Sequence, residues 1–302
     1  RSVFFCVTRD RRYADASKGS LDGEYLDSLE GWSTLRNFRR EHFASAGIPL
    51  TFDTLTKKPC ILNAFSIYEF AKYISDDVHR RGKLMMANSV PIRFGFLCHL
   101  FDTCGIEINW KRGGAFRPED GWIMNYRRAM MFRKPYLFLM NTDFGAWSYA
   151  DTEKYMRRCM FYAFYPSFFS ANASSGHYFS QPKLYNRDRP LFKKYVPIIR
   201  ALSKAGWQPI PHARTSDADV RIERYGESDG GRLYLTLLNT SREAKEAVVE
   251  IDLAGLGLAG KKLSANVLSS GAQLQPAGRG QTAILTLRLA PGDTEAALLR
   301  FD

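Results

Sequence analysis

The sequence predicts an α/β fold: a (β/α)8 TIM-type barrel, incomplete at its N-terminal side, followed by an all-β sandwich. Up to residue 205, short apolar runs alternate with helical segments, which is typical of parallel βαβ units. From residue 218 onward, runs of alternating apolar and polar residues follow one another without a helix, separated by Gly, Ser, Asp and Pro turns. We expect residues 1–206 to form the C-terminal part of the barrel, residues 207–217 a linker and residues 218–302 the sandwich.

The first part of the chain contains six candidate strands, over residues 2–8, 24–26, 49–55, 83–87, 105–110 and 136–140. Apolar residues at helical spacing predict helices over residues 34–46, 63–82, 120–132, 152–164 and 189–205. A closed barrel needs eight strands, so an open sheet is the alternative. We prefer a truncated barrel because the sequence begins in mid-pattern at Arg1, and we expect an N-terminal segment or a second chain to complete it.

The second part contains six runs with strand alternation, over residues 220–225, 232–239, 247–253, 263–268, 282–289 and 295–301. It has no Trp and few candidate catalytic groups. We therefore expect a structural appendage, and we favour this over a sugar-binding module.

The charge balance, 43 Lys and Arg against 31 Asp and Glu, gives a net charge of +12. Such a balance favours anionic partners, among them acidic or sulfated glycans and nucleic acid. The basic residues lie in several groups along the sequence and not in one stripe, so we interpret them as a solvated surface. Nucleic-acid binding would depend on charge alone, and we expect none. No apolar run has transmembrane length, and no membrane partner is expected.

Cofactor and metal chemistry have no support in the sequence. The five cysteines are odd in number and form no CxxC pair, which argues against a disulfide framework and a zinc site. There is no GxGxxG after a strand, no P-loop, no GxSxG and no pair of His at ligand spacing. We expect neither cofactor nor metal. No signal peptide is present, and because the chain opens on Arg1 the localisation stays open between secreted, periplasmic and cytoplasmic.

Four carboxylates lie at predicted strand tips, where parallel barrels hold their catalytic groups. They are Asp27, Asp53, Glu107 and Asp143. Glycoside hydrolysis needs two carboxyl groups facing each other across the scissile bond. We predict Asp27 as the nucleophile and Glu107 as the acid/base, since the apolar neighbours of Glu107 would raise its pKa. Asp143 is the second candidate for the acid.

Each of these carboxylates has a plain structural alternative. Asp27 is a good helix cap, Glu107 would also suit a surface salt bridge, and Asp53 is expected to be a cap. Glu30 is either a support for Asp27 or a surface residue.

Aromatic and amide side chains near these tips suit a sugar site. Three tryptophans follow the acids by three to five positions and would form an apolar floor for a sugar ring, unless they are ordinary packing: Trp32, Trp110 and Trp147. Four amides are expected to bond sugar hydroxyls: Asn88, Asn109, Asn141 and Asn172. Arg93 is expected to meet an acidic substituent on the sugar.

This layout resembles the retaining glycoside hydrolases of α-glycosidase type, in which a (β/α)8 barrel precedes a C-terminal β-sandwich. In that superfamily the nucleophile is an Asp at the tip of strand 4 within a short apolar-Asp motif, and Tyr25-Leu26-Asp27-Ser28 looks like that motif. The run over residues 185–192 also looks like bacterial hydrolase-like families. The resemblance covers nearly the whole chain without naming a family or a sugar. Many members have their acid on strand 5 or 6, whereas here the strand-6 tip would hold Asn88.

Two functions follow from this reading of the sequence. The first is a glycosidase that cleaves O-glycosidic bonds of a poly- or oligosaccharide, anionic ones included, by a retaining two-carboxylate mechanism. The second is a non-catalytic glycan-binding or accessory barrel. They differ on one point: a hydrolase needs two carboxyl groups roughly 5–10 Å apart in one cleft.

Overall fold

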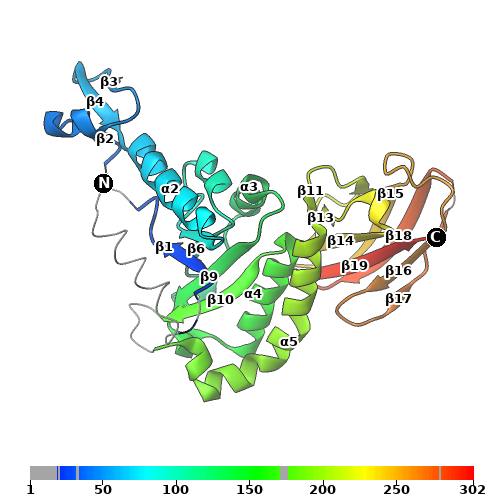
Figure 1. Ribbon diagram of the computed structural model, residues 1–302. Helices are drawn as coiled ribbons and strands as arrows, with labels where there is room; N and C mark the ends of the chain where they lie inside the picture. The colour runs from blue at the N-terminus through cyan, green and yellow to red at the C-terminus, as the bar shows by residue number, and fades with distance from the viewer. Residues whose placement is uncertain (1–18, 20, 32–33, 171–175, 279) are drawn as a thin grey trace. The chain divides into compact units, whose positions relative to one another are not determined.

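The computed structural model describes residues 19, 21–31, 34–170, 176–278 and 280–302 (Figure 1). The chain forms two compact units, Arg1–Gly105 and Ile106–Asp302, and each is described by itself. The strand predicted over residues 2–8 lies outside the described residues.

The first unit is built on parallel strands with a helix packed beside them. Strand β1 (Gly23–Leu26) pairs in parallel with β5 (Leu84–Asn88), which pairs in parallel with the start of β6 (Thr103–Ile108). Helix α2 (Asn63–Arg80) contacts β5 and buries Ala71, Ile74 and Val78, which recur at helical spacing. The short helix η3 (Gly95–Leu100) follows β5. The predictions for β1, α2 and β5 are confirmed.

The helix predicted over residues 34–46 is wrong. This stretch forms the short strand β2 (Arg36–Asn37) and the 3-10 helix η2 (Arg40–Ser45), which buries no residue. Strand β4 (Lys58–Leu62), predicted in part as a loop, pairs antiparallel with β2 and with β3 (Thr51–Asp53). Leu35 and Phe38 are 45% and 43% exposed, so the apolar face of the predicted helix has no core to pack against.

The second unit begins with further strand and helix alternation. The small hairpin β7 (Lys111–Arg112) and β8 (Ala115–Phe116) precedes α3 (Gly121–Met131). Strand β9 (Tyr136–Thr142) then leads through η4 (Phe144–Ala146) into α4 (Tyr149–Tyr162). After strand β10 (Tyr165–Ser170) come η6 (Tyr178–Ser180) and the long helix α5 (Pro182–Ala205). The helices were predicted, although α4 and α5 start earlier: a Ser148–Asp151 capping box begins α4, and Pro182 lies at the start of α5.

Strand β10 is not among the strands predicted from the sequence. It pairs in parallel with β9, so that Phe168 lies opposite Met140. Its residues alternate between half-buried and buried along the strand, and Pro166 occupies one of the buried positions. Parallel strands alternating with helices are therefore confirmed, but the described residues do not contain the eight strands of a closed barrel.

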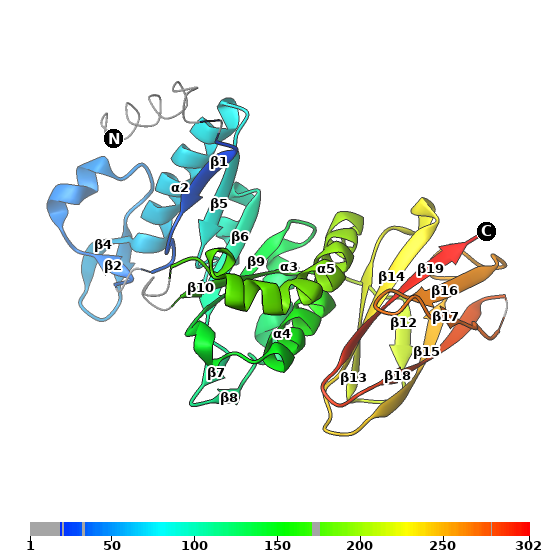
Figure 2. The same ribbon diagram turned by 90° about the horizontal axis from the view of Figure 1, so that it is seen from below.

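The C-terminal part is a sandwich of two antiparallel sheets (Figure 2). One sheet has, in spatial order, β11 (Trp207–Gln208), β13 (Val220–Tyr225), β14 (Arg232–Asn239), β19 (Thr294–Phe301), β16 (Leu263–Val267) and β17 (Gln273–Leu274). The other has β12 (Ala213–Thr215), β15 (Lys245–Asp252) and β18 (Thr282–Leu289). Leu235 and Leu237 of the first sheet share one buried core with Val249 and Leu285 of the second. All six predicted strands are present, with ends shifted by no more than two residues.

The stretch expected to be a linker, residues 207–217, contributes strands to both sheets. β11 pairs with β13 and β12 pairs with β15. Buried hydrogen bonds also fasten the sandwich to α4, because Tyr225 Oη (2.7 Å) and Thr236 Oγ1 (2.9 Å) both donate to the carbonyl oxygen of Phe161. The sandwich therefore packs directly on the helix that follows β9.

Candidate functional site

The carboxyl ends of β1 and β5 bring Asp27 and Asn88 together. Leu26 and Ala87 are register partners in this parallel pair, so the next residue on each strand meets at the same edge of the sheet. Asn88 Nδ2 donates a 2.9 Å hydrogen bond to Asp27 Oδ1, and the Tyr25 hydroxyl donates to the same oxygen at 3.1 Å. Asn88 is buried, whereas Asp27 is exposed to solvent. No helix follows Asp27 directly, so the helix-cap alternative does not apply.

The electrostatics of this pair keep Asp27 ionised. The hydrogen bond from Asn88 lowers the pKa of Asp27 below its ordinary value, and the bond from Tyr25 acts in the same direction. A carboxyl group with a lowered pKa is a carboxylate at neutral pH. It is suited to act as a nucleophile or as a charge stabiliser, and is unsuited to donate a proton.

Both strand ends continue into a residue with an unusual backbone. Ser28 has φ 49° and Ser89 has φ 58°, in the left-handed region that non-glycine residues rarely adopt. Such residues cost energy and cluster at functional sites. They turn the chain sharply after Asp27 and after Asn88, which leaves the two side chains at the rim of the sheet.

Glu30 and Arg93 hold this rim together. The buried carboxylate of Glu30 accepts hydrogen bonds from the backbone N–H groups of Ile92 (3.0 Å), Arg93 (2.7 Å) and Phe94 (3.2 Å). Arg93 Nη2 donates to the Glu30 carbonyl oxygen at 2.6 Å. Arg93, predicted to meet an acidic sugar, is thus engaged by its own chain, and Glu30 proves to be a structural support for the segment after β5.

A second carboxylate–amide pair lies in the other unit. Glu107, near the carboxyl end of β6, accepts a 3.0 Å hydrogen bond from Asn141 Nδ2 on β9. Both side chains are half-buried. The arrangement repeats that of Asp27 and Asn88, since an acid on one strand is held by an asparagine on another. Glu107 therefore stays the candidate for the second catalytic carboxyl.

The other predicted carboxylates and the third amide have local roles. Asp143 is exposed and caps η4, accepting from the N–H of Gly145 at 2.9 Å. Asp53 accepts from the N–H of Thr56 at 2.8 Å, which agrees with its predicted role as a cap. Asn109 Oδ1 accepts from the N–H of Lys111 at 2.8 Å, so it stabilises the turn into β7. Asp143 thus has a structural role in the turn that follows β9.

Two of the three tryptophans predicted as a sugar floor, Trp110 and Trp147, are inside the protein. Trp110 is fully buried among Phe116, Phe138 and Tyr155, and Trp147 is 3% exposed and donates from Nε1 to Thr142 Oγ1 at 2.9 Å. Neither ring offers a face to a ligand, so their predicted role is wrong and the packing alternative holds. Trp32 lies outside the described residues. The predicted amide Asn172 lies outside them too. Among the described residues, Trp122 on α3 is an exposed tryptophan, 68% accessible, and it was not among the predicted site residues.

Within the described residues no group of three or more His, Cys, Asp and Glu side chains could hold a metal ion. No helix formed by these residues has both the length and the apolar character needed to cross a membrane.

The Asp27–Asn88 hydrogen bond leads to a testable prediction about the pKa of the Asp27 carboxyl group. Replacing Asn88 by alanine removes the largest contribution that lowers the Asp27 pKa, so this pKa is expected to rise toward its ordinary value. Carbon-13 NMR titration of the Asp27 carboxyl measures the change directly. Tyr25→Phe, which removes the second bond to the same oxygen, should give a smaller rise. An unchanged titration in Asn88→Ala would contradict the role assigned to Asn88.

Comparison with known proteins gives distant likenesses to glycoside hydrolases. No protein-family model matches the sequence, and no curated protein matches it. Among solved structures, the chain is similar to a GH30 endoxylanase from Clostridium papyrosolvens C71 (12% identity, TM-score 0.40), covering 100% of this chain and 73% of that one. It is also similar to a GH27 β-L-arabinopyranosidase from Geobacillus stearothermophilus (10% identity, TM-score 0.32; 96% and 90%) and to an α-fucosidase from Thermotoga maritima (11% identity, TM-score 0.36; 78% and 48%). These TM-scores are low, so the chemistry of the candidate site has to follow from the residues of this chain.

Proposed function

We propose that this protein is a glycoside hydrolase that cleaves O-glycosidic bonds of a poly- or oligosaccharide by a retaining mechanism. One observation carries the proposal: an exposed carboxylate with a lowered pKa, Asp27, stands at the carboxyl end of a parallel strand and is oriented by Asn88 from the neighbouring strand. This is the position and the protonation state that a glycosidase nucleophile requires.

The reaction assigns one role to each of two carboxyl groups. Asp27 Oδ attacks the anomeric carbon while the bond from that carbon to the leaving oxygen breaks, which forms a glycosyl ester on Asp27. Glu107 is the proposed acid and transfers its proton to the leaving oxygen. Water then attacks the anomeric carbon, Glu107 takes the proton from this water, and Asp27 leaves as a carboxylate. The sugar is released with its original configuration.

Asn88 and Tyr25 act on Asp27 in this scheme. Both donate to Oδ1, so that oxygen of the carboxylate is held in place. The fixed orientation contributes to catalysis because a held reactant loses less freedom in the transition state.

The test is covalent trapping of Asp27. The protein is incubated with a panel of activated 2-deoxy-2-fluoro glycosides, which form a glycosyl ester that hydrolyses slowly, and the labelled peptide is identified by mass spectrometry. We expect the sugar on Asp27 with the matching member of the panel, and NMR should show retained configuration for the corresponding unmodified aryl glycoside. A label on another carboxylate, or an inverted product, would overturn the assignment. Binding of glycans without any turnover would favour the non-catalytic alternative.

A further inference from the structure

Helix α5 carries a stripe of positive charge on one exposed face. Four cations recur at spacings of four, seven and four residues, which places them along one side of the helix: Arg189, Lys193, Arg200 and Lys204. All four are exposed. At 1.5 Å per residue the stripe is about 22 Å long. The stripe is not apparent in the sequence, where the basic residues lie in several groups. Cations at this spacing become neighbours only when the helix forms.

The charge on this face is not neutralised by the helix itself. α5 contains a single acidic residue, Asp188, which is fully buried and bonded to Tyr178 and Arg187. In the part of the chain that the structure describes, none of the four stripe cations forms an ion pair with Asp or Glu within 4.0 Å. Lys194, on a different face, does approach Glu153 at 3.9 Å.

Two adjoining pockets lie along the C-terminal half of the stripe. One, of about 380 Å³, is lined by Val196, Pro197, Arg200, Ala201 and Lys204. The other, of about 440 Å³, shares Ala201 and Lys204 and extends to the sandwich. Together they form a groove with an apolar floor and cationic sides.

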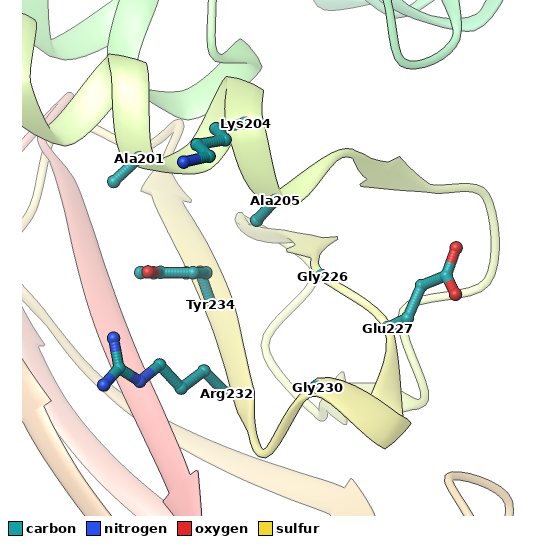
Figure 3. A pocket seen from close by; sticks show the side chains of 8 residues that line it. All are labelled: Ala201, Lys204, Ala205, Gly226, Glu227, Gly230, Arg232 and Tyr234. Atoms are coloured by element: carbon teal, nitrogen blue, oxygen red, sulfur yellow. The ribbon is translucent and has the colours of Figure 1, made fainter.

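Strand β14 completes the groove with a further cation and an aromatic ring. Arg232 and Tyr234, two residues apart on the same face of β14, line the larger pocket opposite the end of α5. Figure 3 shows the ends of Lys204, Tyr234 and Arg232 directed toward the same side of the pocket. Glu227, an acid that also lines this pocket, is neutralised by Arg133 at 2.5 Å. The pocket therefore presents an uncompensated positive charge next to a tyrosine.

We propose that this groove, here called the α5 groove, binds an anionic glycan, one that carries carboxylate or sulfate groups along an extended chain. Carboxylates or sulfates would pair with Arg200, Lys204 and Arg232, while apolar ring faces of the sugar pack on Pro197, Ala201 and the Tyr234 ring. The proposal builds on the proposed glycosidase function only in taking a glycan as the partner. It adds a substrate-holding site within the second unit and names the charge of the substrate.

Nucleic acid is the competing polyanion, and the groove suits it less well. Proteins that hold single strands offer several aromatic side chains in succession for the bases to stack on. The α5 groove has a single aromatic residue among the described residues that line it, and Tyr234 is half-buried. A chain of sugar rings needs only one such contact when its charges are met by the stripe.

The test compares two triple variants of equal charge in binding assays. In the groove variant, Arg200, Lys204 and Arg232 are replaced by alanine; in the control variant, the exposed cations Arg242, Lys261 and Lys262 of the sandwich are replaced. Both lose three positive charges. All proteins carry Asp27→Asn so that no probe is cleaved. The probes are polygalacturonate, heparin, a neutral xylan and a single-stranded DNA 20-mer, measured by affinity electrophoresis and calorimetry at two salt concentrations.

We expect the groove variant to bind polygalacturonate or heparin roughly 10- to 100-fold more weakly, while the control variant stays within about threefold of the parent. Binding of the parent should weaken with salt, and neutral xylan should show no difference between variants. Equal losses in both variants would reduce the effect to net charge and overturn the proposal. Tighter binding of DNA than of either glycan, lost in the groove variant, would assign the groove to nucleic acid instead. None of these outcomes depends on turnover, so they are separate from the trapping test on Asp27.

Discussion

The Asp27→Asn protein is expected to lose glycosidase activity by roughly 10⁴-fold or more in kcat, since removal of a catalytic nucleophile costs this much in other hydrolases. The replacement is nearly isosteric and keeps an acceptor oxygen for Asn88 and Tyr25, so the rim of the sheet should stay folded. What it removes is the negative charge and the nucleophilic oxygen. Initial rates on the aryl glycoside identified by trapping give the measurement, with circular dichroism as the check on folding.

Asp143→Asn is the matched control for this experiment. Asp143 is exposed and caps η4 through one hydrogen bond to Gly145, and asparagine is also a good cap. We expect its activity to stay within about threefold of the wild type. If Asp143→Asn abolished activity and Asp27→Asn did not, the two carboxylates would have to exchange roles.

Chemical rescue separates a nucleophile from a residue that only positions others. In Asp27→Gly, a small anion such as azide has room to attack the anomeric carbon in place of the carboxylate. The product should be a glycosyl azide with the configuration opposite to that of the substrate, because a single displacement replaces two. Activity restored by azide with this product assigns the nucleophile, whereas no rescue combined with unchanged binding would argue for an electrostatic role of Asp27.

The sandwich was predictable from sequence because its signal is local. Alternation along β15 and β18 follows directly from which residues face the core, and the two facing sheets bury the same leucines and valines that made the pattern visible. Helix α2 was predictable for the same reason. Its buried residues recur at helical spacing, and a sheet is present to receive them.

The errors arose where the outcome depends on distant parts of the chain. Residues 34–46 have helical spacing, but no core lies against them, and pairing with β4 decides their structure instead. Strand β10 is not among the predicted strands: Pro166 is unusual in a strand, and the pairing with β9 depends on a distant part of the chain. A local sequence pattern does not indicate which distant strand such a segment pairs with.

The candidate site shows the same division between local and distant information. Asp27 was predictable because a short strand delivers it to an end where catalytic groups gather. The burial of Trp110 and the capture of Arg93 by Glu30 depend on which face of each element meets the core. The number of residues between a side chain and a nearby acidic residue does not indicate which face of its helix or strand that side chain occupies. The charged stripe on α5 was hidden for a related reason, since its cations lie side by side only after the helix forms.

Trp110→Ala is expected to lower the free energy of unfolding by about 3–5 kcal/mol, the cost of truncating a large buried ring. The indole packs on Phe116, Phe138 and Tyr155 and has no exposed surface, so alanine would leave a cavity among rigid aromatic rings. Its ring nitrogen has no hydrogen-bond partner among the described residues. Trp110→Phe should therefore cost much less than the alanine variant, because it retains most of the volume and breaks no hydrogen bond. Urea denaturation of the three proteins provides the measurement.

Trp122→Ala is the control for the stability loss expected of Trp110→Ala. The Trp122 ring is 68% exposed, so its removal should change stability by no more than about 0.5 kcal/mol. If Trp110 held a sugar, as its place in the sequence suggested, its alanine variant would keep its stability and lose substrate affinity. A large loss of stability with unchanged KM per folded molecule places Trp110 in the core. Because the ring packs against the aromatic residues of β9 and α4, the same loss would show how strongly these elements depend on one side chain.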